Sequence, residues 1–120
     1  MTISLAFGVI FALSIPTPAS AQQNHQKSAS HERVQQLYEQ ARQSFSQGDY
    51  ATAAGKFEQA LKLNPDSPEL LSNLGVAYHM EGRFRDAVAT LEKALERNPR
   101  LLPSNLILGL DLVRLGEPGQ

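Results

Sequence analysis

Apolar residues recur along most of the chain at the spacing of amphipathic α-helices. From Val34 onward, large apolar and small side chains return every three or four positions, which places them on one face of a helix. Glycine and proline residues interrupt this pattern at regular intervals, and each uninterrupted stretch is long enough for a helix of roughly three turns. The pattern predicts five helices, near Glu32–Gln47, Tyr50–Leu63, Pro68–Glu81, Phe84–Arg97 and Leu102–Leu115.

The sequence repeats this pattern: two full copies are followed by the beginning of a third. Pro99 follows Pro65 by 34 positions, and Gly82 follows Gly48 by the same distance. Gly116 follows Gly82 at this distance again, so a third copy has started there. A fixed period of this length in helical sequence indicates helix pairs that stack as an array.

The repeated glycines and prolines fall where the helices must end. Gly48, Gly82 and Gly116 each follow the first helix of a copy, and glycine takes a positive φ at a helix C-terminus without a steric penalty. Asn-Pro pairs at 64–65 and 98–99 close the second helices, because proline disfavours helical geometry in the residue before it. Each copy therefore predicts a helix, a tight turn and a second helix that runs back along the first.

Small residues lie inside the helices at positions where two helices would meet. Ala41, Gly75 and Gly109 share one position of the repeat, in the first helix. Ala53 and Ala87 share another position, in the second helix. A glycine inside a helix costs about 1 kcal/mol relative to alanine, so its presence indicates a packing requirement. We expect these small residues to face each other and to let the two backbones approach closely.

These residues resemble the pattern of the tetratricopeptide repeat (TPR), with its bulky residue, Leu-Gly, aromatic and turn glycine, then alanines and a closing proline. The first copy departs from the pattern at two positions, where Gln40 and Ser44 replace Leu and an aromatic residue. The third copy begins with Leu108 and Gly109 and stops at Gln120. The second copy matches nearly in full, at Leu71, Leu74, Gly75, Tyr78, Gly82, Phe84, Ala87, Leu91, Ala94, Leu95 and Pro99.

The resemblance implies an all-α fold, in which antiparallel helix pairs stack as a right-handed superhelix of two full repeats and the first helix of a third. The helix near Leu102–Leu115 is rich in apolar residues on all sides, and such a helix is normally covered by other elements. A terminal capping helix would instead present a polar outer face. We therefore expect the chain to be the N-terminal part of a longer array.

The first 21 residues contain no charged side chain. Ile3–Ile15 form an apolar run that Pro16 interrupts, and this run is shorter than the roughly 20 residues that a membrane-spanning helix needs. The small side chains of Ala19 and Ala21 suit the subsites of a signal peptidase. We predict an export signal at residues 1–21, which is cleaved after Ala21, contacts the membrane only in transit and delivers the protein to the periplasm or the cell exterior. An uncleaved anchor and a buried helix are the alternatives.

A polar segment lies between the predicted signal and the first helix. Residues 22–31 carry no large apolar side chain, so they have little to contribute to a core. We predict a flexible linker at 22–31, followed by the helical array at 32–120. The repeats that the resemblance implies within this array are 34–67, 68–101 and the partial repeat 102–120.

Charge and cysteine content exclude several classes of function. The sequence holds 11 Lys and Arg against 12 Asp and Glu, a formal net charge of −1, and these residues form no basic stripe that would attract a phosphate backbone. Nucleic acid is therefore not an expected partner. The chain contains no cysteine, which removes disulfides and thiol catalysis and leaves a regular apolar core as the source of stability.

The residues that could carry chemistry are dispersed. His25 and His31 lie in or beside the predicted linker, and the resemblance directs His79 into the concave face, whereas a zinc site needs three or four converging ligands. Carboxylates such as Glu58 and Glu92 fall on outward helix positions and read as solvated surface. The serines lack a nucleophile-elbow context, and phosphate-binding glycine motifs are absent. We expect no enzymatic activity, no metal and no cofactor.

By resemblance, a partner lies in the concave groove that the first helices of the repeats line. One TPR subfamily clamps the C-terminal carboxylate of chaperone tails with Lys, Asn and Arg residues, and only Asn73 fits that set here. Tyr38, Arg42 and Ile107 stand where the other clamp residues would be, so this mode of binding is disfavoured. We interpret the groove as a site for an apolar or amphipathic protein segment, unless a continuing array covers its third-repeat part. The candidate residues are Tyr38, Arg42, Phe45, Asn73, Val76, His79, Met80, Leu106, Ile107 and Leu110.

The function predicted from these observations is that of a protein–protein interaction scaffold or adaptor, which binds a peptide or protein segment in its groove. Two alternatives remain open at the level of the sequence. The chain could be the N-terminal docking or regulatory domain of a larger exported enzyme, or a structural module for self-association.

Overall fold

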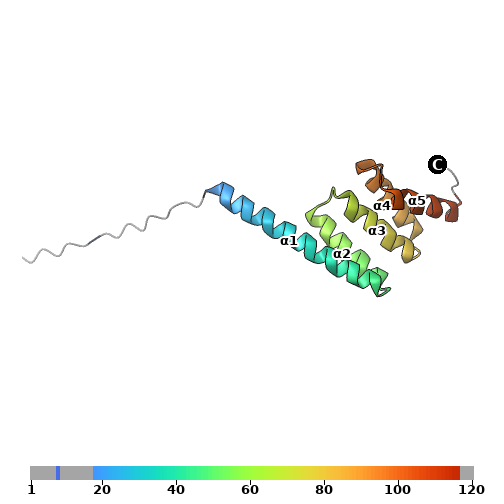
Figure 1. Cartoon of the computed structure of the whole chain (residues 1–120), viewed down its shortest axis with the longest axis horizontal. Helices are drawn as coiled ribbons and strands as arrows, with labels where there is room; N and C mark the ends of the chain where they lie inside the picture. The colour runs from blue at the N-terminus through green and yellow to red at the C-terminus, as the bar shows by residue number, and fades with distance from the viewer. Residues whose placement is uncertain (1–7, 9–17, 117–120) are drawn as a thin grey trace, which may run out of the picture.

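The fold is a stack of α-helices. The computed structural model describes residue 8 and residues 18–116, and the regular structure in that part of the chain is helical throughout. The predicted bounds of the last four helices differ from the observed ones by no more than one residue. In chain order the helices are α1 (Ala19–Ser46), α2 (Tyr50–Leu63), α3 (Pro68–Met80), α4 (Phe84–Arg97) and α5 (Leu102–Arg114) (Figure 1).

Neighbouring helices in the sequence are neighbours in space. α1 pairs with α2, and α3 pairs with α4, while α5 packs against both α4 and α3 (Figure 1). The short turn within each pair makes the two helices antiparallel. The predicted all-α stack of two helix pairs and a fifth helix is therefore confirmed.

Glycines form the turns between the helices, as predicted. Gly48, Gly82 and Gly116 have φ angles of 77°, 77° and 75°. After the first of them, the Asp49 backbone N–H donates to the Ser44 carbonyl at 3.0 Å, a bond that closes the end of α1 as in a Schellman motif. Any Cβ meets a steric penalty at this φ, so the turn favours glycine.

Side-chain caps start two of the helices. The Asp49 carboxylate accepts a hydrogen bond from the Thr52 backbone N–H at 3.2 Å, at the beginning of α2. The Ser67 hydroxyl accepts one from the Leu70 backbone N–H at 3.3 Å, at the beginning of α3. Pro68 occupies the first turn of α3, where a missing N–H costs no hydrogen bond.

The core runs through the middle of the stack. Of the small residues at the predicted contact positions, Ala41, Ala53, Gly75 and Ala87 are buried, whereas Gly109 is exposed. A Cβ added to Gly75 would lie 2.5 Å from the Leu91 side chain, so the glycine accommodates Leu91 and not Ala87 as expected. The core residues are Val34, Leu37, Ala41, Ala53, Ala54, Phe57, Ala60, Leu70, Leu74, Ala77, Tyr78, Ala87 and Leu91.

The segment predicted to be a flexible linker, residues 22–31, is helical, so that prediction is wrong. α1 begins at Ala19 and continues through the segment, since no glycine or proline interrupts the chain between Pro18 and Gly48 and its Gln, Ala and Lys residues favour helix. Its side chains are nonetheless mostly exposed, and the first buried residue of α1 is Val34. This part of α1 extends beyond the other helices (Figure 1).

Most of the predicted export signal, residues 1–21, lies outside the described residues. Its last three residues, Ala19–Ala21, form the first turn of α1. Among the helices described, none combines the length and the apolar character needed to cross a membrane.

The fifth helix buries polar as well as apolar residues. We expected a continuing array to cover its apolar surface, and that expectation stays a prediction. Its buried residues are Ser104, Asp111 and Leu112. The polar residues are buried because they find partners on α3, and this orientation turns the leucines outward. Leu102, Leu106, Leu110 and Val113 are 78%, 67%, 49% and 64% exposed, respectively.

Candidate partner-binding groove

A depression of about 340 Å³ lies between α1 and α3. It contains five of the ten residues that the sequence places in the groove, namely Tyr38, Arg42, Phe45, Asn73 and Val76. Ser46 and Phe57 complete its lining. The first and second repeats therefore bring these predicted residues together on the face formed by their first helices.

Aromatic contacts hold the wall of this depression in place. The ring of Tyr38 meets that of Phe57 edge to face, with the centroids 6.0 Å apart. Phe45 meets Tyr50 in the same way at 5.0 Å. Both Tyr38 and Phe45 also pack against the buried core. Because edge-to-face pairs fix ring orientation, the apolar surface of the depression is preformed.

Two polar side chains in the depression are available to a ligand. Arg42 lies 3.5 Å from the Glu39 carboxylate, and both side chains are exposed, so solvent screens this pair and it contributes little. The Asn73 side chain makes no hydrogen bond within the part of the chain that the structure describes. The guanidinium of Arg42 and the carboxamide of Asn73 thus lie beside the aromatic side chains of the depression.

A second depression of about 320 Å³ continues the groove toward the start of the array. Tyr38 lines both depressions and separates them. Apart from Tyr38, its lining residues are not among the ten predicted groove residues, although two of them, Gln35 and Glu69, share one position of the repeat. Its lining is His31, Val34, Gln35, Tyr38, Asn64, Ser67, Glu69 and Leu70.

The other five predicted groove residues do not join either depression. Ile107 packs against the core. Met80, Leu106 and Leu110 are exposed. His79 is partly buried, and its Nδ1 lies 2.5 Å from the Asp111 carboxylate. The predicted third-repeat residues therefore contribute to neither depression, and their role in the groove stays a prediction.

Two polar pairs join α3 to α5, and sequence reasoning missed both. The Ser72 and Ser104 hydroxyls lie 2.5 Å apart. His79 bonds to Asp111 seven residues further along both helices. His79 also meets the Phe84 ring edge to face, with the centroids 5.7 Å apart. The sequence did hold one signal for the second pair, since Asp111 is the one carboxylate of the leucine-rich helix α5. A carboxylate that is buried in such a helix needs a hydrogen-bonding partner.

Tyr78 and Glu58 form a further contact between the repeats. The Tyr78 hydroxyl donates to the Glu58 carboxylate at 2.5 Å, and the Arg83 guanidinium lies 4.3 Å from the centre of the tyrosine ring. Burial and this hydrogen bond raise the pKa of Tyr78 above its ordinary value, so the hydroxyl keeps its proton and remains a donor. Glu58 is exposed to solvent, as predicted, and it also links α2 to α3.

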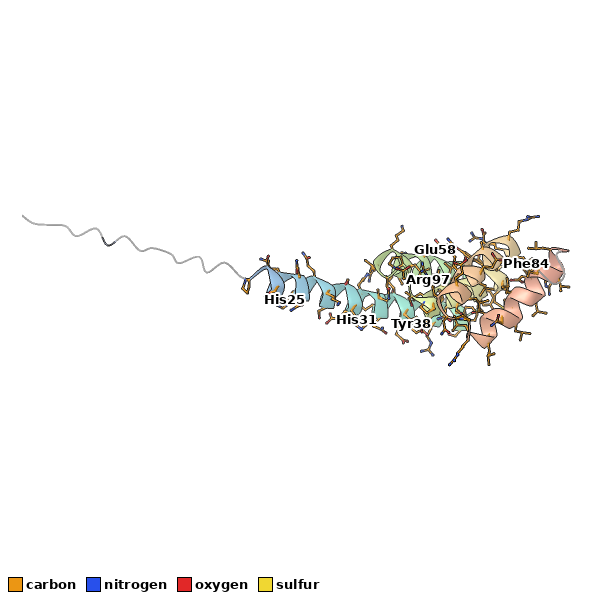
Figure 2. All side chains as sticks on the ribbon, turned by 90° about the horizontal axis from the view of Figure 1, so that it is seen from above. His25, His31, Tyr38, Glu58, Phe84 and Arg97 are labelled. Carbon is orange, nitrogen blue, oxygen red and sulfur yellow. The ribbon has the colours of Figure 1, made fainter. Side chains whose placement is uncertain are left out.

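Metal-ligating residues do not converge in the described structure. Within residue 8 and residues 18–116, no group of three or more His, Cys, Asp or Glu side chains is placed to hold a metal ion. Figure 2 shows His25 and His31 on the part of α1 that extends from the stack. Both side chains are exposed there.

Comparison with known proteins agrees with this architecture. Residues 44–106 match the family profile described as "Tetratricopeptide repeat". The TPR2AB-domain:pHSP90 complex of yeast Sti1 is similar in structure, with a TM-score of 0.68 over 82% of this chain and 40% of that chain, at 18% sequence identity. This similarity shows a shared fold.

Two cyanobacterial proteins are similar in sequence. The photosystem I assembly protein Ycf3 of Synechococcus sp. strain WH7803 is 45% identical over 56 residues, which cover 44% of this chain and 32% of that protein. The protein of the same name from strain CC9605 is 44% identical over 55 residues, which cover 43% of this chain and 32% of that protein. The matched region thus spans about a third of these relatives.

The family match covers more than half of the 120 residues and includes all of α2, α3 and α4. The glycine turns, the buried small residues and the period of the sequence follow the same repeat. The chain therefore belongs to the tetratricopeptide repeat family.

Proposed function

We propose that this protein is a non-catalytic scaffold that binds an extended peptide or protein segment in the groove between α1 and α3. The observation that carries the proposal is the preformed depression in which Tyr38, Phe45 and Val76 stand beside the polar groups of Arg42 and Asn73. Concave, largely apolar sites with a few fixed polar groups are typical of ligand binding. Scaffolding by a helical repeat array requires a surface of this kind.

The lining defines the chemistry of the segment. An aliphatic or aromatic side chain of the ligand would pack between the rings of Tyr38 and Phe45 and against Val76. An acidic group nearby would pair with Arg42, because Glu39 neutralises it only weakly. The free donor and acceptor of Asn73 would hold the ligand main chain. An amphipathic segment with an acidic residue next to an apolar one satisfies all three.

The similarity to the Ycf3 proteins supports the same class of role. Those relatives are named as photosystem I assembly proteins, a name that implies action on other proteins. We extend from this only the general role of holding a client protein, because the matched region spans about a third of the relatives.

We further propose that the scaffold acts after export, to the periplasm or the cell exterior. The support is the uncharged apolar start of the sequence, followed by small residues at Ala19 and Ala21. The protein should be recovered from the periplasmic fraction of an expressing bacterium, with Gln22 as its first residue by N-terminal sequencing. Recovery of the intact chain from the cytosol would contradict this.

The groove can be tested without knowledge of the natural partner. A phage-displayed library of linear peptides would be selected against the full chain, and the affinity of each selected peptide measured for two groove variants. We expect Arg42→Glu and Val76→Asp each to weaken binding by about tenfold or more. Arg42→Glu reverses the charge that would pair with an acidic ligand, and Val76→Asp places a carboxylate in the apolar wall.

Arg85→Glu is the matched control for Arg42→Glu. Arg85 is exposed on α4 and lines neither depression of the groove, so reversal of its charge should leave the affinity unchanged. If the selected peptides bind the groove variants as tightly as the unaltered chain, the groove is not the binding site.

A further inference from the structure

The two depressions of the groove between α1 and α3 carry opposite charges. The depression that Phe45 and Val76 line, here called the Arg42 depression, has Arg42 as the one charged residue of its lining. The depression that continues the groove toward the start of the array, here called the Glu69 depression, has Glu69 as the one carboxylate of its lining and holds no Lys or Arg. Tyr38 lines both. The groove therefore has a cationic end and an anionic end.

The carboxylate of Glu69 is positioned by its neighbours and is free to bind a cation. The Ser67 hydroxyl donates to Glu69 Oε2 at 3.2 Å, and the same hydroxyl oxygen accepts from the Leu70 backbone N–H at 3.3 Å. Glu69 makes no ion pair with any residue that the structure describes. Its negative charge is therefore available to a ligand in the Glu69 depression.

Neutral hydrogen-bonding groups share the lining with this carboxylate. The side chains of Gln35 and Asn64 line the Glu69 depression and make no hydrogen bond within the described part of the chain. Each offers a carboxamide oxygen as an acceptor. A guanidinium has five donors in one plane and stacks on aromatic rings, so it can bond to several such acceptors beside the ring of Tyr38. This lining suits an arginine side chain better than the compact ammonium of lysine.

The repeat sets how far apart the two charges lie along the groove. Glu69 on α3 shares its repeat position with Gln35 on α1. Arg42 follows Gln35 by seven residues on the same helix, a distance of about 10 Å at roughly 1.5 Å per residue. In an extended polyproline-type segment, residues three positions apart lie on one face and about 9 Å apart. Two ligand side chains at this spacing would therefore reach both charges.

We propose that the groove binds a segment in which an arginine and an acidic residue stand three positions apart, with the arginine at Glu69 and the acidic residue at Arg42. This inference rests on the proposed function and adds to it a basic residue and a direction. If the segment lay the other way round, each of its charges would meet a like charge, which disfavours that orientation. The order of the two charged residues is therefore part of the specificity.

A phage-displayed library of linear peptides, selected against the full chain, tests this order. Among the selected peptides, arginine three positions from Asp or Glu should be enriched by about tenfold or more over the starting library, in one order only. A synthetic peptide of the most frequent sequence is then measured by fluorescence anisotropy. Replacement of its arginine by citrulline, which keeps the shape but not the charge, should weaken binding by about tenfold.

Variants at Glu69 locate the arginine of the peptide. Glu69→Lys should weaken binding by about tenfold or more, and Glu69→Gln should weaken it less, because it removes the charge without reversing it. The losses from Glu69→Gln and from citrulline should not add, because each removes the same ion pair. Glu92→Lys is the matched control for Glu69→Lys, since Glu92 is exposed on α4 and lines neither depression.

A double variant reverses the groove. Arg42→Glu combined with Glu69→Arg should bind the original peptide weakly, and it should prefer a peptide in which the arginine and the acidic residue have been exchanged. This recovery of affinity also shows that the double variant is folded. Circular dichroism checks the single variants, whose substituted side chains are exposed.

An effect of Glu69→Lys no larger than that of Glu92→Lys would overturn the inference, as would selected peptides without an enriched arginine. If Arg42→Glu and Val76→Asp still weaken binding in that case, the proposed function stands and only the role of Glu69 is lost. If those two variants also bind as tightly as the unaltered chain, the proposed function fails together with the inference.

Discussion

The imidazole Nδ1 of His79 lies 2.5 Å from the carboxylate of Asp111, thirty-two positions later in the chain. The Asp111 side chain is fully buried, and its second oxygen has no hydrogen-bond partner among the described residues. A buried carboxylate with one partner depends strongly on that partner, because desolvation of the unpaired group is costly. This pair therefore decides which face of α5 turns toward α3.

Replacement of Asp111 by alanine should loosen α5. We expect Asp111→Ala to lower the free energy of unfolding by about 1–3 kcal/mol, since it leaves the partly buried His79 without its acceptor. Hydrogen exchange should accelerate in α5 (Leu102–Arg114) before it accelerates in α2. As a control, the double variant Ser72→Ala with Ser104→Ala removes both partners of the other polar pair and should be nearly neutral. Equal losses in the two variants would contradict this account.

Two glycines at the same repeat position should respond oppositely to substitution. Gly75→Ala should destabilise the protein by about 1–3 kcal/mol, because its Cβ would lie 2.5 Å from Leu91 and the core must shift. Gly109→Ala should stabilise it by about 0.5–1 kcal/mol, since the new methyl group has open space and alanine favours helix. Urea unfolding measures both. A stabilised Gly75→Ala would mean that Leu91 does not fill this position.

The hydroxyl of Tyr78 should contribute measurably to stability. Tyr78→Phe removes its hydrogen bond to Glu58 and should cost about 1 kcal/mol, a modest value because Glu58 is exposed to solvent. Tyr50→Phe is the control, since the Tyr50 hydroxyl makes no hydrogen bond within the described residues. In the unaltered protein, deprotonation of Tyr78 should need a pH above the ordinary tyrosine pKa of 10.0, because burial raises the pKa of Tyr78. The difference in ultraviolet absorbance between the unaltered protein and Tyr78→Phe in alkaline solution follows this hydroxyl.

The Asp49 cap of α2 should make the free energy of unfolding depend on pH in acid solution. Hydrogen bonds from Thr52 lower the pKa of Asp49 in the folded protein below its ordinary value of 3.8. The unfolded chain then binds the proton more tightly, so the stabilisation is complete above the ordinary pKa and is lost as the pH falls through the folded one. In Asp49→Asn, which keeps a capping oxygen without the charge, stability should fall less steeply between pH 5 and pH 2.

The comparison uses chemical denaturation at several pH values. Other carboxylates contribute to the acid dependence of both proteins, so the difference between the two slopes is the quantity that reports on Asp49. Parallel slopes would show that the charged cap does not favour the folded state.

Local signals in the sequence were sufficient for the helices and their turns. Gly48 and Gly82 are needed for positive φ whatever surrounds them, and the closing Asn-Pro pairs end a helix through the geometry of two residues. The groove was half predictable for the same reason, because residues such as Arg42 and Val76 share one repeat position in successive first helices.

Features that depend on contacts between repeats could not be read in this way. The distance of thirty-two positions between His79 and Asp111 follows from how α5 lies on α3, which the repeat pattern does not encode. The prediction of a flexible linker at residues 22–31 was wrong for another reason. Their polar composition indicates exposure but does not distinguish an exposed helix from a coil. The structure shows both an exposed segment and a helix there.

The exposed half of α1 also fixes where the groove lies relative to the first turn of that helix. From Ala19 to Arg33 the helix precedes the first buried residue, Val34, and at 1.5 Å per residue this half is about 20 Å long. A coil of the same length would let the stack tumble about its attachment. A continuous helix instead works as a spacer arm that fixes both the distance and the rotation between the first turn of α1 and the groove. Whatever binds that turn therefore also orients the binding face.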